Sequence, residues 1–139
     1  MSLVKYDNES LKIMSLFEKV TRTRLKDSFV DNNGLLTFIV NERELGRAVG
    51  KQAVNVKKLE KLLNRKIKIL EFNSNIINFI KNLIYPLKAR EIKQEGEEII
   101  IKDSDIKIKG LLIGKNAKNL RNTESIVKKY FQINEIKVI

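Results

Sequence analysis

The chain has 139 residues, of which 42% are hydrophobic and 32% are charged, a balance typical of one ordinary globular domain or two very small ones. It contains no cysteine and no histidine, which excludes disulfides, cysteine-based zinc sites and catalysis by a thiol or an imidazole. Lysine and arginine number 28 against 17 acidic residues. The net charge of +11 favours a polyanionic partner such as RNA, DNA or an anionic lipid surface.

Hydrophobic periodicity predicts a helix and then a series of short elements in the first half of the chain. Asp7 or Ser10 can cap the first helix, with Leu11, Met14 and Phe17 on its apolar stripe. A strand, a turn, a strand, a short helix, a longer helix and a closing strand follow over 22–30, 31–34, 35–40, 42–49, 54–63 and 66–72.

The second half of the chain predicts the same order of elements. Its first helix ends at Pro86, the only proline, and Ser104 or Asp105 can cap the short helix that runs to Ile113. The helix, strand, turn, strand, longer helix and closing strand fall on 75–85, 87–94, 95–97, 98–102, 117–130 and 135–139. The order α-β-β-α-α-β therefore occurs twice. It predicts an α+β fold of two domains, 1–73 and 74–139, each with a three-stranded sheet covered by helices.

An internal repeat accompanies this order. Residues 46–60 align with 110–124 at a constant offset of 64. The identical pairs are Gly46 and Gly110, Gly50 and Gly114, Lys51 and Lys115, Ala53 and Ala117, Asn55 and Asn119, and Glu60 and Glu124. Both copies thus contain a Gly-Lys-x-Ala turn between two helices, which indicates two versions of one unit.

The repeated turn does not fit a nucleotide-binding P-loop. The spacing between its glycines is one residue too short, and Gln52 and Asn116 stand where a magnesium-binding hydroxyl is required. A second interpretation fits better: a tight turn at the start of a helix offers free backbone N–H groups and the positive end of the helix dipole to a phosphate. The same glycine could also be a simple helix cap, but the recurrence of lysine after it favours the functional interpretation.

The sequence Gly-Lys-x-Ala-x-Asn between two helices resembles the signature of KH domains, and α-β-β-α-α-β is the type II order. Two such units filling the chain resemble the archaeal NusA-like transcription factors. The resemblance implies single-stranded RNA binding during transcription elongation, pausing or termination, with RNA polymerase as a further partner. In KH domains the GXXG loop clamps about four nucleotides. Both loops here depart from GXXG at their fourth position, where Ala53 and Ala117 replace glycine. Because alanine starts helices well and adds one methyl group, we expect the turn to form.

The residues predicted to bind RNA are the two loops and their helical flanks. They are Arg47, Val49, Gly50, Lys51, Gln52, Ala53, Asn55, Lys57, Ile113, Gly114, Lys115, Asn116, Ala117, Lys118, Asn119 and Arg121. We predict no catalytic residue, metal, cofactor or small-molecule substrate, because no constellation of side chains indicates an enzyme. Four phenylalanines fall on apolar faces and are assigned to the core rather than to base stacking, namely Phe17, Phe38, Phe72 and Phe79.

Two alternatives remain open: a ribosome-associated or RNA-processing KH protein, and a protein–protein scaffold whose altered loops no longer bind RNA. No segment resembles a signal peptide, and apolar runs such as 98–102 are too short to span a membrane. The sequence therefore predicts a cytoplasmic protein without a membrane partner.

Overall fold

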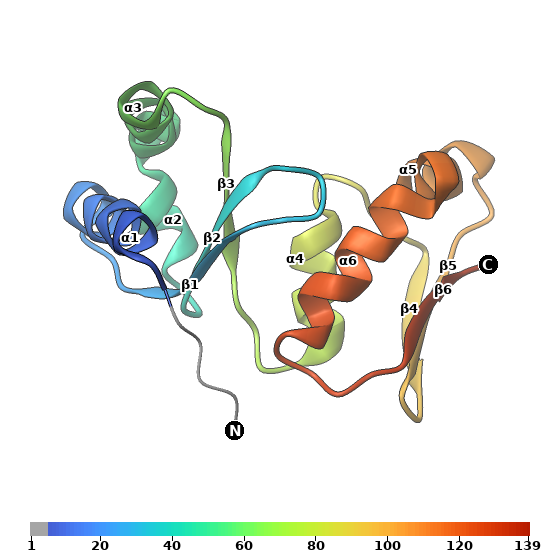
Figure 1. Ribbon diagram of the computed structural model, residues 1–139. Helices are drawn as coiled ribbons and strands as arrows, with labels where there is room; N and C mark the ends of the chain where they lie inside the picture. The colour runs from blue at the N-terminus through green and yellow to red at the C-terminus, as the bar shows by residue number, and fades with distance from the viewer. Residues whose placement is uncertain (1–5) are drawn as a thin grey trace. The chain divides into compact units, whose positions relative to one another are not determined.

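The protein has an α+β fold with two three-stranded sheets, consistent with KH-like domains (Figure 1). The computed structural model describes residues 6–139. Residues 1–5, with which the predicted first domain begins, lie outside the described part. The chain separates into two compact units. One comprises the residues up to Val30 together with Leu35–Phe72, and the other comprises Asp31–Gly34 and Asn73–Ile139.

The first unit has three helices beside one sheet (Figure 1). Its elements are α1 (Asn8–Thr21), β1 (Leu25–Val30), β2 (Leu36–Val40), α2 (Leu45–Val49), a 3₁₀ turn η1 (Lys51–Ala53), α3 (Val54–Leu63) and β3 (Ile67–Glu71). The strands lie in the order β1-β2-β3, with β1 antiparallel and β3 parallel to β2. The predicted order of elements is present.

The core of the first unit lies between α1 and the central strand. Phe17 and Phe38 are fully buried, as expected, and their rings stack with centroids 4.4 Å apart. Phe72, also assigned to the core, is only half-buried. The predicted stripe of α1 is wrong in one position, because Leu11 is 50% exposed. The side chains that pack on the core include Ile13, Leu16 and Val20, which together with Phe17 recur at helical spacing and form a broader stripe.

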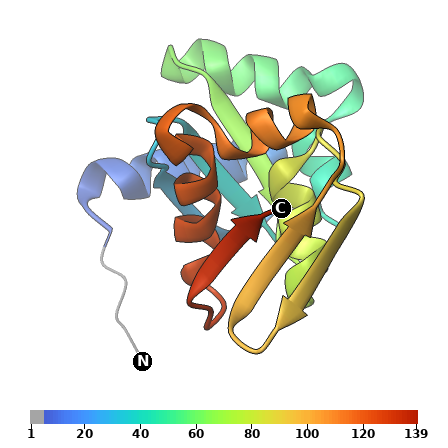
Figure 2. The same ribbon diagram turned by 90° about the vertical axis from the view of Figure 1, so that its right-hand side faces the viewer.

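The second unit repeats the arrangement, and its sheet faces the viewer in Figure 2. Its elements are α4 (Ile76–Ile84), β4 (Glu91–Glu95), β5 (Glu98–Lys102), α5 (Ile106–Ile113), a 3₁₀ turn η2 (Lys115–Ala117), α6 (Lys118–Lys128) and β6 (Glu135–Val138). The sheet order is β4-β5-β6, again with one antiparallel and one parallel pair. Phe79, assigned to the core, is fully buried.

Three elements begin well after their predicted start, two of them after a residue with a left-handed backbone. Arg22 has φ 58° and ends α1, so β1 begins at residue 25 and not at 22. Arg43 has φ 70°, which delays α2 to Leu45. β4 begins only at Glu91, after the Arg90 N–H has bonded to a carboxylate oxygen of Asp103 at 2.9 Å.

Aspartates cap two of the helices. Of the two candidates in each half, Asp7 caps α1 by accepting from the Ser10 N–H at 2.7 Å, and Asp105 caps α5 by accepting from the Lys107 N–H at 2.8 Å. The hydrogen bond from the backbone N–H of Ser10 lowers the pKa of Asp7, because it stabilises the charged carboxylate. No helix within residues 6–139 is both long and apolar enough to cross a membrane.

Candidate nucleic-acid interface

The two Gly-Lys-x-Ala turns have the same backbone conformation. Gly50 ends α2 with φ 79° and ψ 166°, and Gly114 ends α5 with φ 74° and ψ 173°, a region open essentially only to glycine. There is also no room for a side chain at these two glycines. A Cβ on Gly50 would lie 2.9 Å from a methyl carbon of Val54, and one on Gly114 would lie 2.7 Å from the side chain of Asn119. These two glycines are therefore required for both conformational and steric reasons.

The last two residues of each turn are left-handed although neither is glycine. Gln52 and Ala53 have φ 53° and 59°, and Asn116 and Ala117 have φ 56° and 60°. The turn forms as expected, but the reason given for it, that alanine starts a helix well, is wrong. Each alanine is the N-cap of the following helix, outside the helical region, and has no side chain that can cap. Such strain costs about 1–3 kcal/mol per residue and is concentrated at functional sites in proteins.

Two backbone N–H groups of each turn, those of its second and third residues, take no part in the hydrogen bonds within the turn. In the first turn Lys51 keeps helical dihedral angles and Gln52 is left-handed, the succession that forms an anion-binding nest. The hydrogen bonds within this turn use the N–H groups of Gly50, Ala53 and Val54. None of these bonds uses the N–H of Lys51 or Gln52, and both residues are exposed. The second turn has the same pattern, so each can receive an anionic oxygen.

An asparagine holds together the two helices that flank each turn. The Asn55 Nδ2 donates to the Arg47 carbonyl oxygen at 3.2 Å, and the Asn119 Nδ2 donates to the Leu111 carbonyl oxygen at 3.0 Å. Both asparagines were predicted to bind RNA. The structure gives them a positioning role as well, because their amides link the two helices on either side of the turn.

The remaining predicted residues surround the turns. The aliphatic residues before the glycines, Val49 and Ile113, are half-buried. The cationic residues are exposed, namely Arg47, Lys51, Lys57, Lys115, Lys118 and Arg121. Of these six, only Arg121 forms an ion pair among residues 6–139. Five cations are thus available to an anionic ligand within the two units.

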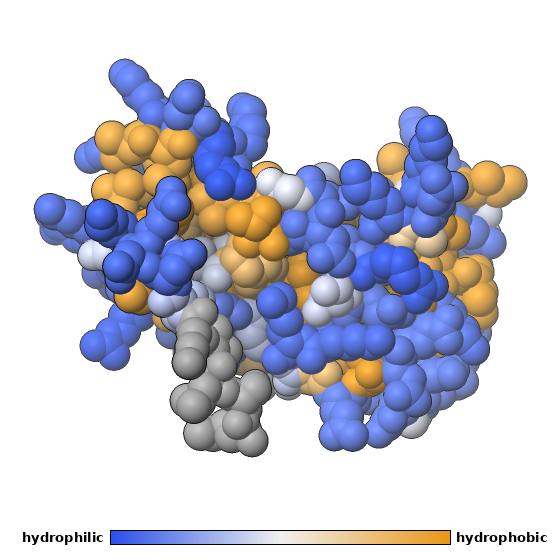
Figure 3. Space-filling model, viewed as in Figure 1, coloured by the Kyte–Doolittle hydropathy of each residue, from blue (hydrophilic) through white to orange (hydrophobic). Residues whose placement is uncertain are grey.

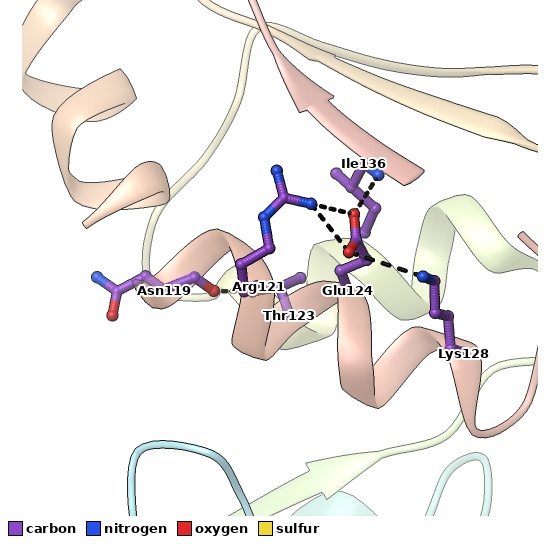
Figure 4. A network of polar contacts seen from close by, with 6 residues as sticks. All are labelled: Asn119, Arg121, Thr123, Glu124, Lys128 and Ile136. Carbon is purple, nitrogen blue, oxygen red and sulfur yellow. Dashed lines mark hydrogen bonds and ion pairs between the residues drawn. The ribbon is translucent and has the colours of Figure 1, made fainter. Parts of the chain in front are cut away.

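Arg121 belongs to a network around a buried carboxylate (Figure 4). The Nη1 of Arg121 donates to both oxygens of Glu124, at 2.9 and 2.8 Å, and the backbone N–H of Ile136 donates to the same carboxylate at 2.8 Å. The Lys128 Nζ lies 3.7 Å from it. Glu124 is only 7% exposed, so this network fastens α6 to β6 and fixes the helix that begins at the second turn.

The first unit has a weaker version of this fastening. The Ile67 N–H donates to Glu60 at 3.1 Å, which joins α3 to β3, and Lys66 approaches the same carboxylate only to 4.0 Å. Reasoning from the sequence missed both glutamates as functional supports. The signal was present, since Glu60 and Glu124 are one of the identical pairs of the repeat.

No family model matches the chain. The chain is 30% identical to the probable transcription termination protein NusA of Methanocaldococcus jannaschii, over 100% of this chain and 77% of that protein. It is 27% identical to the protein of that name from Thermoplasma acidophilum, over 99% of this chain and 97% of the relative. The crystal structure of a protein designated APE1850 matches with a TM-score of 0.74 and 27% identity, covering 96% of this chain and 100% of that one.

These relatives, matched over nearly the whole chain, are named as transcription termination proteins. The chain belongs to the family of archaeal NusA-like transcription termination proteins. The recognition made from the Gly-Lys-x-Ala turns is thereby confirmed.

Proposed function

We propose that the protein binds single-stranded RNA through its two turns and acts in transcription elongation or termination with RNA polymerase. The main observation behind this proposal is the turn that both units repeat, with a left-handed backbone, two N–H groups outside the hydrogen bonds of the turn and an exposed lysine. As part of this proposal, the chain forms two type II KH domains, over 1–73 and 74–139. The transcriptional part of the proposal is supported by the names of the relatives.

The proposed mechanism is binding without chemistry. The turn amides and the ammonium groups of Lys51 and Lys115 hold phosphates, while the aliphatic residues beside the turn receive bases. With about four phosphates engaged per unit, log K should fall against log salt with a slope of about −3 for each unit. Binding that does not depend on salt would contradict this mechanism.

The test is a fluorescence-anisotropy titration with labelled single-stranded RNA of random sequence and matched DNA, at two salt concentrations. The variants are Lys51→Asp/Gln52→Asp, Lys115→Asp/Asn116→Asp and their combination. Asparagine and aspartate tolerate left-handed backbone, so these changes preserve the turn. We expect each pair to weaken RNA binding and the combination to abolish it, with the protein still folded.

A matched control separates a specific site from net charge. Lys12→Asp/Ser15→Asp introduces the same change of charge at two exposed positions of α1. If this control weakens binding as much as the turn variants do, the charge of +11 acts without a site. If the wild type does not bind RNA, the scaffold alternative stands, and the methyl groups of Ala53 and Ala117 are its explanation. Copurification with ribosomal particles instead of polymerase would favour the ribosome-associated alternative.

A further inference from the structure

The loop that joins α1 to β1 is fastened by two buried threonines. Thr21 and Thr23 are 4% and 6% exposed, and their hydroxyl oxygens lie 2.8 Å apart. The Thr21 hydroxyl also donates to the Phe17 carbonyl oxygen at 2.9 Å and accepts from the Thr23 N–H at 3.2 Å. These buried hydrogen bonds fix the backbone from which the remaining side chains of the loop project.

Two exposed arginines, Arg22 and Arg24, alternate with these threonines. Neither side chain forms an ion pair or a hydrogen bond among residues 6–139. The carboxylates before and after the loop, Glu18 and Asp27, already accept hydrogen bonds from other groups. Figure 3 shows hydrophilic residues projecting on the left of the view, over α1 and the loop that follows it. The fold therefore presents two guanidinium groups on a rigid support without using them internally.

The second unit has two cations in the corresponding loop, between α4 and β4. Lys88 and Arg90 are exposed and alternate with the half-buried Leu87 and Ala89. Neither cation forms an ion pair within the described part of the chain. The alternation of inward side chains with outward cations thus occurs at the same place in both units.

An exposed aromatic ring accompanies the cations of the second loop. Tyr85 directly follows α4 and is 70% exposed, whereas every other aromatic residue among residues 6–139 is at least half-buried. Lys81 is exposed and lies one helical turn earlier on the same face, since the Tyr85 N–H donates to its carbonyl oxygen at 3.2 Å. An aromatic ring next to cations suits a nucleic-acid strand, whose bases stack and whose phosphates are anionic.

These loops lie apart from the Gly-Lys-x-Ala turns of their units. Leu25 pairs with Val40, so the first loop lies beside the end of β2, near the start of α2, whereas the turn follows the other end of α2. β1 is also the sheet edge opposite to β3, the strand that α2 contacts. In the second unit Glu91 pairs with Lys102, which gives its loop the same placement.

We infer that the loop after the first helix of each unit is a second RNA contact, in which the two cations hold phosphates and, in the second unit, Tyr85 stacks on a base. This inference rests on the proposed function. Arginine binds phosphate through several N–H groups at once, and the negative face of an aromatic ring favours a base over the carboxylates of an acidic protein partner. RNA longer than the stretch that one turn clamps is thus held at both places.

The experiment compares a labelled RNA of about four nucleotides, the length that one turn clamps, with one about three times as long, by fluorescence anisotropy at several salt concentrations. The variants are Arg22→Asn/Arg24→Gln and Lys88→Gln/Arg90→Gln. Asparagine tolerates the left-handed backbone at residue 22, so thermal unfolding should not fall. Each pair should weaken binding of the longer RNA about three- to tenfold and reduce the salt slope by about 1.4, while affinity for the short RNA stays unchanged.

A second set of variants tests the aromatic ring. Tyr85→Leu should weaken binding of the longer RNA about fivefold or more, because the stacked base loses its partner. It should bind an abasic ribose-phosphate oligomer of the same length as the wild type does. Tyr85→Phe keeps the ring and should bind both as the wild type does.

The matched control is Lys12→Gln/Lys61→Gln, which removes two exposed charges elsewhere in the first unit. Loop variants that lose no more affinity for RNA than this control would overturn the inference alone. Loop variants that bind RNA normally but no longer bind a labelled oligoglutamate would also overturn it, and would assign the loops to an acidic protein partner. A wild type that binds no RNA would instead overturn the proposed function.

Discussion

The left-handed alanines predict that replacing alanine with glycine stabilises this protein, the reverse of the usual effect. Ala53 and Ala117 have φ 59° and 60°. A left-handed backbone costs a residue with a Cβ about 1–2 kcal/mol. Glycine avoids this cost. However, glycine also makes the unfolded chain more flexible, which lowers the free energy of unfolding by about 0.4–1 kcal/mol. We therefore expect each change to raise the free energy of unfolding by about 0.5–1 kcal/mol.

The assay is urea and thermal unfolding of Ala53→Gly, Ala117→Gly and the double variant. The double variant should gain about 1–2 kcal/mol and unfold about 3–6 °C higher. Ala48→Gly is the matched control. Ala48 is fully buried inside α2, where loss of the methyl and of helix propensity should cost about 1–2 kcal/mol.

One result would refute this reasoning. If Ala53→Gly and Ala117→Gly lower stability as the Ala48→Gly control does, the alanines act as helix formers and the strain is absent. The same variants also report on binding, since glycine lets a phosphate approach the turn more closely. RNA affinity should therefore rise in the double variant even where the gain in stability is small.

Further predictions concern the turn glycines, the fastening glutamates and the first helix cap. Gly50→Ala and Gly114→Ala should each destabilise by about 2–4 kcal/mol in urea unfolding, and Gly114→Ala more, because the backbone nitrogen of Asn119, 2.9 Å from the added carbon, cannot turn away. Glu124→Ala should cost about 2–3 kcal/mol by unpairing a buried N–H and a guanidinium, and Glu60→Ala about 1 kcal/mol. Equal losses would contradict the ranking by burial. The pKa of Asp7 is lowered by folding, so its contribution is present above the unfolded pKa of about 3.9 and is lost as pH falls through the folded value. Asp7→Asn should therefore flatten the loss of stability below about pH 4, as followed by thermal unfolding at several pH values.

Much of the architecture could be predicted because it is carried by short-range patterns. Periodicity gave the order of helices and strands, and the repeat located both turns to the residue. Boundaries failed at Arg22 and Arg43, where non-glycine residues adopt positive φ. Arginine has no preference for that conformation, so the surrounding structure imposes it and no local signal announces it.

The side-chain contacts around the turns were harder to predict from the sequence than the position of the turns. The residue types Gly, Lys, Ala and Asn indicated a phosphate-binding turn. However, the bond from Asn55 to a carbonyl eight residues earlier depends on the angle between two helices, which pattern does not encode. The same holds for Glu124, whose carboxylate meets a strand that begins eleven residues later. Both features become visible only when elements separated in sequence are packed together.

The internal repeat helps to distinguish residues that the fold of each unit requires from residues that a ligand would require. The positions preserved with the same bonds in both copies are Gly50, Asn55 and Glu60 with their counterparts, and each has a partner inside its own unit. Lys51 and Gly46 are also preserved with their counterparts, yet no internal contact of the described residues explains them. Residues kept without an internal reason are those a ligand would require. Under the proposed function, the cation beside each turn is the residue of this group that an RNA phosphate would contact.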